Sequence, residues 1–153
     1  MSESAAPANG PTRAQIVAMA RDWLGTPYQH QASVKKQGTD CLGLIRGLWR
    51  ELYGYEPEAV PAYAADWQSG REGTLLQMAV SRHLVPAPAG DMQPGNVLLF
   101  RMQTSGPARH LGLVSDQGRF IHAYAGRCVT ESWLSRWWLA RLVSTHDFPG
   151  VTS

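Results

Sequence analysis

Strong charge of either sign is missing from this chain. Its 14 Lys and Arg side chains are nearly balanced by 12 Asp and Glu, which leaves a formal net charge of +2 at pH 7. The densest basic cluster is only Lys35–Lys36, so the sequence gives no support for nucleic acid as a partner. No apolar run approaches the roughly 18 residues that a membrane-spanning helix needs. A hydrophobic content of 44% with 17% charged residues instead indicates a folded globular protein.

Cysteine is also scarce, since Cys41 and Cys128 are the only two. Two cysteines do not build a disulfide-stapled scaffold. The N-terminus has no basic segment followed by an apolar one, so we expect no secretory signal and synthesis in the cytoplasm. We expect residues 1–11 to be flexible and residues 12–148 to form one domain. If the protein acts outside the cytoplasm, something else must carry it there.

Helical periodicity dominates the first half of the chain and strand alternation the second half. We expect helices over residues 13–24, 41–53 and 73–82, with a loop over residues 28–39. We expect strands over residues 96–101, 111–116, 119–124 and 127–132, then a short turn and a final strand within residues 133–142. Helices followed by strands predict an α+β fold with an antiparallel sheet.

Cys41 is a candidate nucleophile because of its place at the start of a predicted helix. Thr39 and Asp40 can cap this helix. The helix dipole and unpaired N–H groups at such a terminus favour a thiolate, so we expect a lowered thiol pKa. A buried structural cysteine is the alternative interpretation.

Two histidines supply a candidate base and its orienting partner. His110 immediately precedes a predicted strand, and His122 lies on the next one. Pairing about the expected turn at Asp116–Gln117–Gly118 places His110 opposite Ala123 and beside His122. The second imidazole can then orient the first, as a nucleophile–base–orienter set requires.

Other assignments of the same residues are weaker. A zinc site could use Cys41, His110, His122 and Cys128, but these four lack the short spacings of common zinc motifs. We expect Cys128 to pack in a strand, and His30, His83 and His146 to face solvent. The tryptophans at positions 133, 137 and 138 could stack on a glycan, although core or edge packing is the simpler interpretation.

Five segments in order resemble the motifs of NlpC-type cell-wall peptidases, which have a papain-like fold. They are Gly25-Thr26-Pro27-Tyr28, Asp40-Cys41-Leu42-Gly43-Leu44, Pro94-Gly95-Asn96-Val97-Leu98-Leu99-Phe100, His110-Leu111-Gly112-Leu113-Val114 and Gly118-Arg119-Phe120-Ile121-His122-Ala123. The segment from Asp40 to Gly54 further resembles single-domain peptidases encoded with phage tails and gene transfer agents.

The resemblance implies a cysteine peptidase that needs no cofactor or metal and cuts peptidoglycan stem peptides. The expected bond joins D-γ-glutamate to meso-diaminopimelate. In the implied triad, Cys41 is the nucleophile, His110 the general base and His122 the orienting residue. Tyr28 matches a tyrosine near the oxyanion. Asp40 matches an acidic residue that either caps the helix or binds a substrate amine.

Two departures from the family pattern bear on substrate choice. Gln29-His30-Gln31-Ala32 replaces a segment that carries Gly-Gly in many members, and Leu42 replaces the usual serine after the cysteine. Two rival functions stay open: a cysteine acyltransferase on the same fold, and a non-enzymatic tail-assembly protein. The sequence does not determine whether residues 55–90 form a lid over the site.

Overall fold

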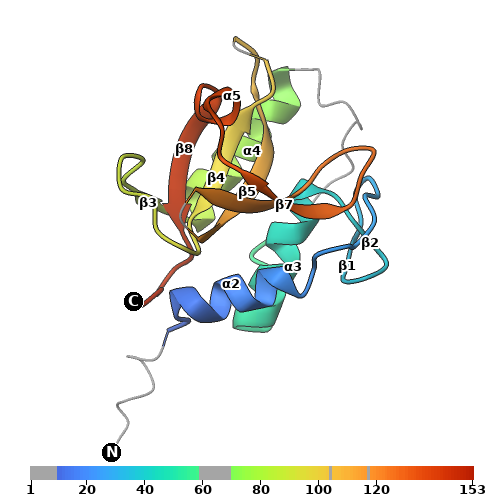
Figure 1. Cartoon of the computed structure of the whole chain (residues 1–153), viewed down its shortest axis with the longest axis vertical. Helices are drawn as coiled ribbons and strands as arrows, with labels where there is room; N and C mark the ends of the chain where they lie inside the picture. The colour runs from blue at the N-terminus through green and yellow to red at the C-terminus, as the bar shows by residue number, and fades with distance from the viewer. Residues whose placement is uncertain (1–9, 59–69, 104, 117) are drawn as a thin grey trace, which may run out of the picture.

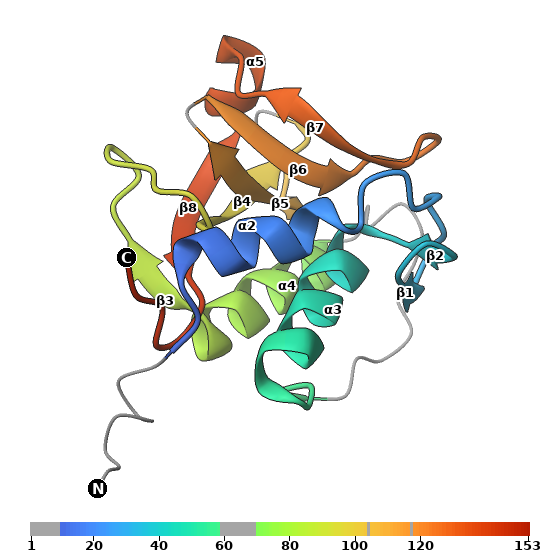
Figure 2. The ribbon, with the colours of Figure 1, turned by 60° about the horizontal axis from the view of Figure 1, so that its bottom comes forward.

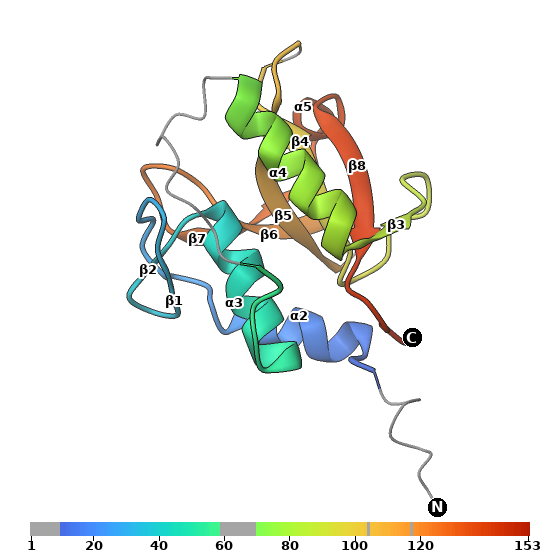
Figure 3. The same cartoon turned by 180° about the vertical axis from the view of Figure 1, so that it is seen from behind.

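Three helices cover one face of an antiparallel sheet in the computed structural model, which describes residues 10–58, 70–103, 105–116 and 118–153 (Figures 1 and 2). The helices are α2 (Arg13–Arg21), α3 (Cys41–Tyr53) and α4 (Gly70–His83). Viewed from behind, α4 lies across the strands beside α3 (Figure 3). The short helix α5 (Arg136–Leu139) lies on the opposite side of the sheet (Figure 2).

The main sheet has six strands in the order β3-β8-β4-β5-β6-β7, and all neighbouring pairs are antiparallel. The strands are β3 (Val85–Ala87), β4 (Val97–Arg101), β5 (Ala108–Asp116), β6 (Arg119–Ala123), β7 (Val129–Trp133) and β8 (Leu142–Asp147). A small two-stranded sheet, β1 (Ser33–Val34) with β2 (Gly38–Thr39), precedes α3. The predicted α+β class is confirmed.

The expected helix boundaries are correct for α3, because local signals define both of its ends. The Asp40 side chain accepts a hydrogen bond from the Gly43 N–H at 2.7 Å, and Gly54 ends the helix with φ of 83°. Other expectations were wrong in part: α2 ends at Arg21 rather than residue 24, and the expected loop over residues 28–39 contains β1 and β2. Residues 1–9 and part of the 55–90 segment lie outside the described residues.

Two apolar clusters occupy the two faces of the sheet. The larger lies between the helices and the sheet and includes Trp23, Leu44 and Leu111. The smaller, on the face that carries α5, includes Phe100 and Phe120 with Trp138 packed against them. The expectation that His146 faces solvent was wrong: its side chain is buried, because β8 lies between β3 and β4.

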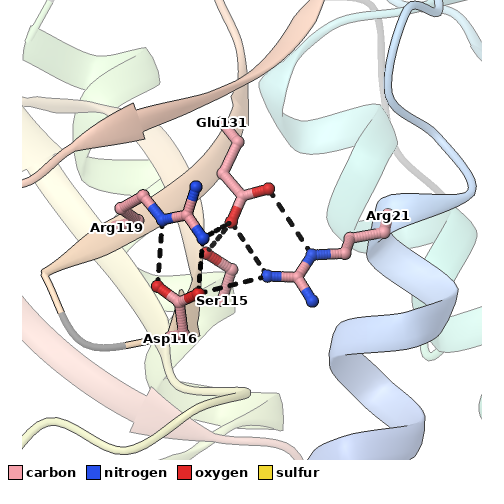
Figure 4. Close-up of polar contacts among 5 residues, drawn as sticks. All are labelled: Arg21, Ser115, Asp116, Arg119 and Glu131. Carbon is pink, nitrogen blue, oxygen red and sulfur yellow. Dashed lines mark hydrogen bonds and ion pairs between the residues drawn. The ribbon is translucent and has the colours of Figure 1, made fainter.

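A charged network fastens the end of α2 to the sheet (Figure 4). The Arg21 guanidinium lies 3.0 Å from Glu131 on β7 and 3.4 Å from Asp116 on β5. Arg119 on β6 also pairs with Asp116, and Ser115 donates to Glu131. Half-exposed ion pairs of this kind contribute little stability each, but together they connect one helix to three strands.

Candidate active site

Cys41 lies at the N-terminus of α3, and its sulfur lies against the backbone of β5. The Sγ atom is 3.9 Å from the carbonyl oxygen of Arg109, to which the thiol donates. The N–H groups of Leu111, Leu42 and Cys41 itself also interact with the sulfur. The thiol therefore lies beside the backbone on both sides of His110, and only 5% of Cys41 is exposed.

The protonation state of Cys41 differs from the expectation of a thiolate. Burial is the largest influence and raises the pKa of the Cys41 thiol to about 12, and the negative charge of Asp40 raises it further. The three backbone N–H groups lower the pKa but do not outweigh burial. The predicted lowering of the thiol pKa is wrong for this structure, in which the thiol is neutral.

His110 and His122 form the expected imidazole pair. The Nε2 atom of His110 lies 2.8 Å from Nδ1 of His122. Burial, and then the neighbouring His122, hold the pKa of His110 well below 6.5, and burial lowers the pKa of His122 to about 4. Both rings are therefore neutral near pH 7. Nε2 of His110 is engaged with His122, and in the described part of the chain no hydrogen bond joins the other ring nitrogen, Nδ1, to the Cys41 sulfur.

The expected strand register was wrong by one residue, and the error matters. Leu113 pairs with Ile121 and Val114 with Phe120, with a shift between Val114 and Asp116. Continuing this register places His122 across from Gly112, on the same face as His110. The expected register, with Ala123 opposite His110, would have turned the His122 ring to the other face of the sheet.

Two further residues around this pair were not identified from sequence as part of the site. Ser132 on β7 lies with its Oγ atom 2.9 Å from Nε2 of His122, so it extends the hydrogen-bonded series. The Trp138 ring stacks on His110 at 5.3 Å and meets His122 edge-on at 5.1 Å. Trp133 and Trp137 are instead 69% and 44% exposed. Thr130 lies directly opposite His122 in the β6–β7 register. Strand alternation puts Ser132, two residues later, on the same face, so this pattern could have identified Ser132 from sequence.

Tyr28 is held beside Cys41 by backbone contacts on both sides. Its N–H donates to the carbonyl of Arg127 at 3.0 Å, and it bridges to Thr39 on β2. Burial, followed by the charges of Cys41 and Asp40, raises the pKa of the Tyr28 phenol to about 12. The hydroxyl therefore stays protonated and available as a hydrogen-bond donor.

Asp40 is buried, and backbone N–H groups occupy both of its carboxylate oxygens. One oxygen accepts from Gly43 at 2.7 Å and the other from Gln31 at 2.7 Å. Of the two roles left open by the sequence, this geometry agrees with helix capping. A role in substrate binding stays a prediction.

Cys128 adjoins Pro27 through an isolated bridge just before β7, and both cysteines are free thiols. Among the described residues, no group of His, Cys, Asp and Glu side chains is arranged to hold a metal ion. Within the same residues, no helix has the length and apolar character that crossing a bilayer requires.

Comparison with known proteins gives a consistent result. The model of the NlpC/P60 family matches residues 25–146. The chain is 27% identical to the gamma-DL-glutamyl hydrolase of Bacillus subtilis, covering 90% of this chain and 30% of that protein. It is 30% identical to the Escherichia coli protein named murein DD-endopeptidase MepS/murein LD-carboxypeptidase, covering 75% of this chain and 51% of the relative. The chain thus spans about half the length of these relatives or less.

The fold of this chain is similar to those of solved structures. An NlpC/P60 family protein from Bacillus cereus superposes with a TM-score of 0.66 at 20% identity, covering 92% of this chain and 41% of the other. The NlpC/p60 domain of the peptidoglycan hydrolase SagA gives a TM-score of 0.61 at 19% identity, covering 89% of this chain and 98% of that domain.

Proposed function

Because the chain belongs to the NlpC/P60 family, we propose that it is a cysteine peptidase that hydrolyses peptide bonds of peptidoglycan. The observation that carries the proposal is the placement of the Cys41 thiol against the backbone that flanks His110, whose ring is in turn bonded to His122. The family match supports the reaction class, and this geometry supports the chemical roles that we propose for the three residues.

In the proposed reaction, Nδ1 of His110 removes the Cys41 proton as the sulfur attacks the substrate carbonyl. The N–H of Cys41 and the Tyr28 hydroxyl donate to the oxyanion. His110 then returns the proton to the leaving amine, which leaves a thioester on Cys41. Water, activated by the same imidazole, hydrolyses the thioester and regenerates the thiol. These steps require no cofactor.

The proposed scissile bond joins D-γ-glutamate to meso-diaminopimelate in the stem peptide. The name of one relative, a gamma-DL-glutamyl hydrolase, supports a γ-glutamyl bond, and that of another, a murein DD-endopeptidase, supports peptidoglycan as the substrate while naming a different bond. Delivery by a phage tail or gene transfer agent is a further part of the proposal, and it rests only on the resemblance of the Asp40–Gly54 segment. Immunodetection of the protein in purified particles tests this delivery.

The direct test of the activity is digestion of purified peptidoglycan by the wild type, Cys41→Ala and Cys128→Ala under reducing conditions. Mass spectrometry of the soluble fragments identifies the bond. We expect cut stem peptides from the wild type and Cys128→Ala, and none from Cys41→Ala. The proposal is wrong if Cys41→Ala releases as many stem-peptide fragments as the wild type, or if folded wild type releases none.

A further inference from the structure

A cavity of about 360 Å³ borders His122, the partner of His110, and neither Cys41 nor His110 is among its lining residues. Its lining includes His122 and Ser132, together with Tyr124, Arg127, Trp137 and Trp138. The cavity is therefore continuous with the proposed catalytic machinery, although the steps assigned to Cys41 and His110 make no use of it. Its volume is at the small end of the range for ligand pockets.

Arg127 supplies the positive charge of this cavity. Its side chain is exposed, and within the described part of the chain its guanidinium makes no ion pair. Its backbone is fixed, because the Arg127 N–H donates to Tyr124 and the Arg127 carbonyl accepts from Tyr28, both at 3.0 Å. The guanidinium thus starts from a rigid turn next to the proposed oxyanion tyrosine, where it can form paired hydrogen bonds with a carboxylate.

Trp137 and Trp138 form the aromatic wall of the cavity, and Arg141 holds Trp137 in place. The Arg141 guanidinium lies over the Trp137 ring, 3.8 Å from its centroid, and donates to the Trp137 carbonyl at 2.9 Å. The edge of Trp137 meets Trp138 at 4.9 Å between centroids. The 44% exposed Trp137 is therefore a fixed surface suited to an aliphatic stem.

The position of the cavity indicates which part of a substrate it would hold. His110 must deliver its proton to the leaving amine, so the leaving part of the substrate extends over the imidazoles and away from Cys41. We propose that this cavity is a recognition site for the residue on the leaving-amine side of the cut bond, with Arg127 binding its carboxylate and Trp137 its aliphatic stem. This inference rests on the proposed peptidase function.

The test uses the tetrapeptide L-Ala–γ-D-Glu–meso-diaminopimelyl–D-Ala and two carboxamide forms, one at the diaminopimelate side chain and one at the terminal D-Ala. Wild type, Arg127→Ala, Arg127→Lys and Arg136→Ala are compared; Arg136 is on α5 but does not line the cavity. We expect the wild type to prefer the acid over the diaminopimelate side-chain carboxamide by about tenfold in kcat/KM, and to cut the D-Ala carboxamide as well as the acid. Arg127→Ala should lose that preference through KM with kcat little changed, Arg127→Lys should keep part of it, and Arg136→Ala should behave as the wild type.

Calorimetric binding of the same three peptides to Cys41→Ala, with and without Arg127→Ala, separates this inference from the proposed reaction. If no peptide is cut but Cys41→Ala prefers the acid and Arg127→Ala removes that preference, the site stands and the peptidase proposal fails. Equal binding of all three peptides to Cys41→Ala overturns the site, as does a preference that survives Arg127→Ala.

Discussion

The Nε2 atom of His110 and the Nδ1 atom of His122 are 2.8 Å apart, and the two residues are 5% and 2% exposed. One of these nitrogens must carry a hydrogen and the other must accept it. When the hydrogen is on Nε2 of His110, the Nδ1 atom of that ring is free to act as a base toward Cys41. With His122 as the acceptor, the pair therefore holds His110 in the tautomer that the proposed reaction needs.

Removing the His122 ring should lower catalysis without weakening substrate binding. His122→Ala leaves Nε2 of His110 without its acceptor, and we expect a loss in kcat of roughly 10²-fold with KM little changed. His122→Asn, whose side-chain carbonyl can accept the same hydrogen bond, should recover part of the loss. Steady-state kinetics on a stem peptide measures both. A loss confined to KM would show that His122 acts on substrate binding instead.

Ser132 should act on catalysis indirectly, because its hydroxyl contacts His122 rather than His110 or Cys41. Its hydroxyl accepts from Nε2 of His122 when His122 accepts from His110, so this bond is compatible with the same tautomer and fixes the orientation of the His122 ring. We expect Ser132→Ala to lower kcat about fivefold, the value of one ordinary hydrogen bond. Ser135→Ala is the matched control, because the Ser135 side chain makes no capping bond on α5. Equal kcat for the two variants would exclude a positioning role for Ser132.

The resting enzyme should contain a neutral thiol. Burial raises the pKa of Cys41 to about 12, so thiolate absorbance in the ultraviolet should be absent at pH 7 when Cys128→Ser is compared with the Cys41→Ser/Cys128→Ser double variant. Because burial and His122 lower the pKa of His110, the base form persists below pH 6.5. The acid limb of kcat/KM should therefore have its midpoint below 6.5. A thiolate signal at neutral pH would instead indicate a preformed ion pair.

Local signals explain what the sequence predicted well. Asp40 caps the start of α3 and Gly54 ends it, and both residues lie next to the helix in the sequence. The bounds of α3 could therefore be predicted from local sequence. Strand register is different. β5 is buried along nearly its whole length on both faces, so its apolar pattern does not distinguish one register from the next.

The remaining differences depend on contacts distant in sequence. The two-residue strands β1 and β2 are too short to show alternation. The thiol pKa is set by how deeply tertiary packing buries Cys41, which the helix-terminus argument does not include. Ser132 contacts His122 because β7 pairs with β6, and Trp138 contacts His110 because α5 packs on the face of the sheet that carries the two histidines.

Gly112 provides the final prediction, because the close packing around His122 depends on its missing side chain. A Cβ at Gly112 would lie 2.6 Å from Cδ2 of Phe120, whose ring stacks on His122 at 4.2 Å between centroids. Gly112→Ala should therefore cost about 1–3 kcal/mol in the free energy of unfolding. It should also lower kcat, since the Phe120 ring that must shift is stacked on the His122 imidazole.

Gly90→Ala is the control, because nothing lies within 4 Å of its built Cβ. Denaturant unfolding and steady-state kinetics should leave that variant close to the wild type. Combining Gly112→Ala with Phe120→Leu relieves the contact but removes the ring that supports His122. The double variant should regain stability relative to Gly112→Ala while kcat stays low. If kcat recovers together with stability, packing alone explains the effect and Phe120 does not position His122.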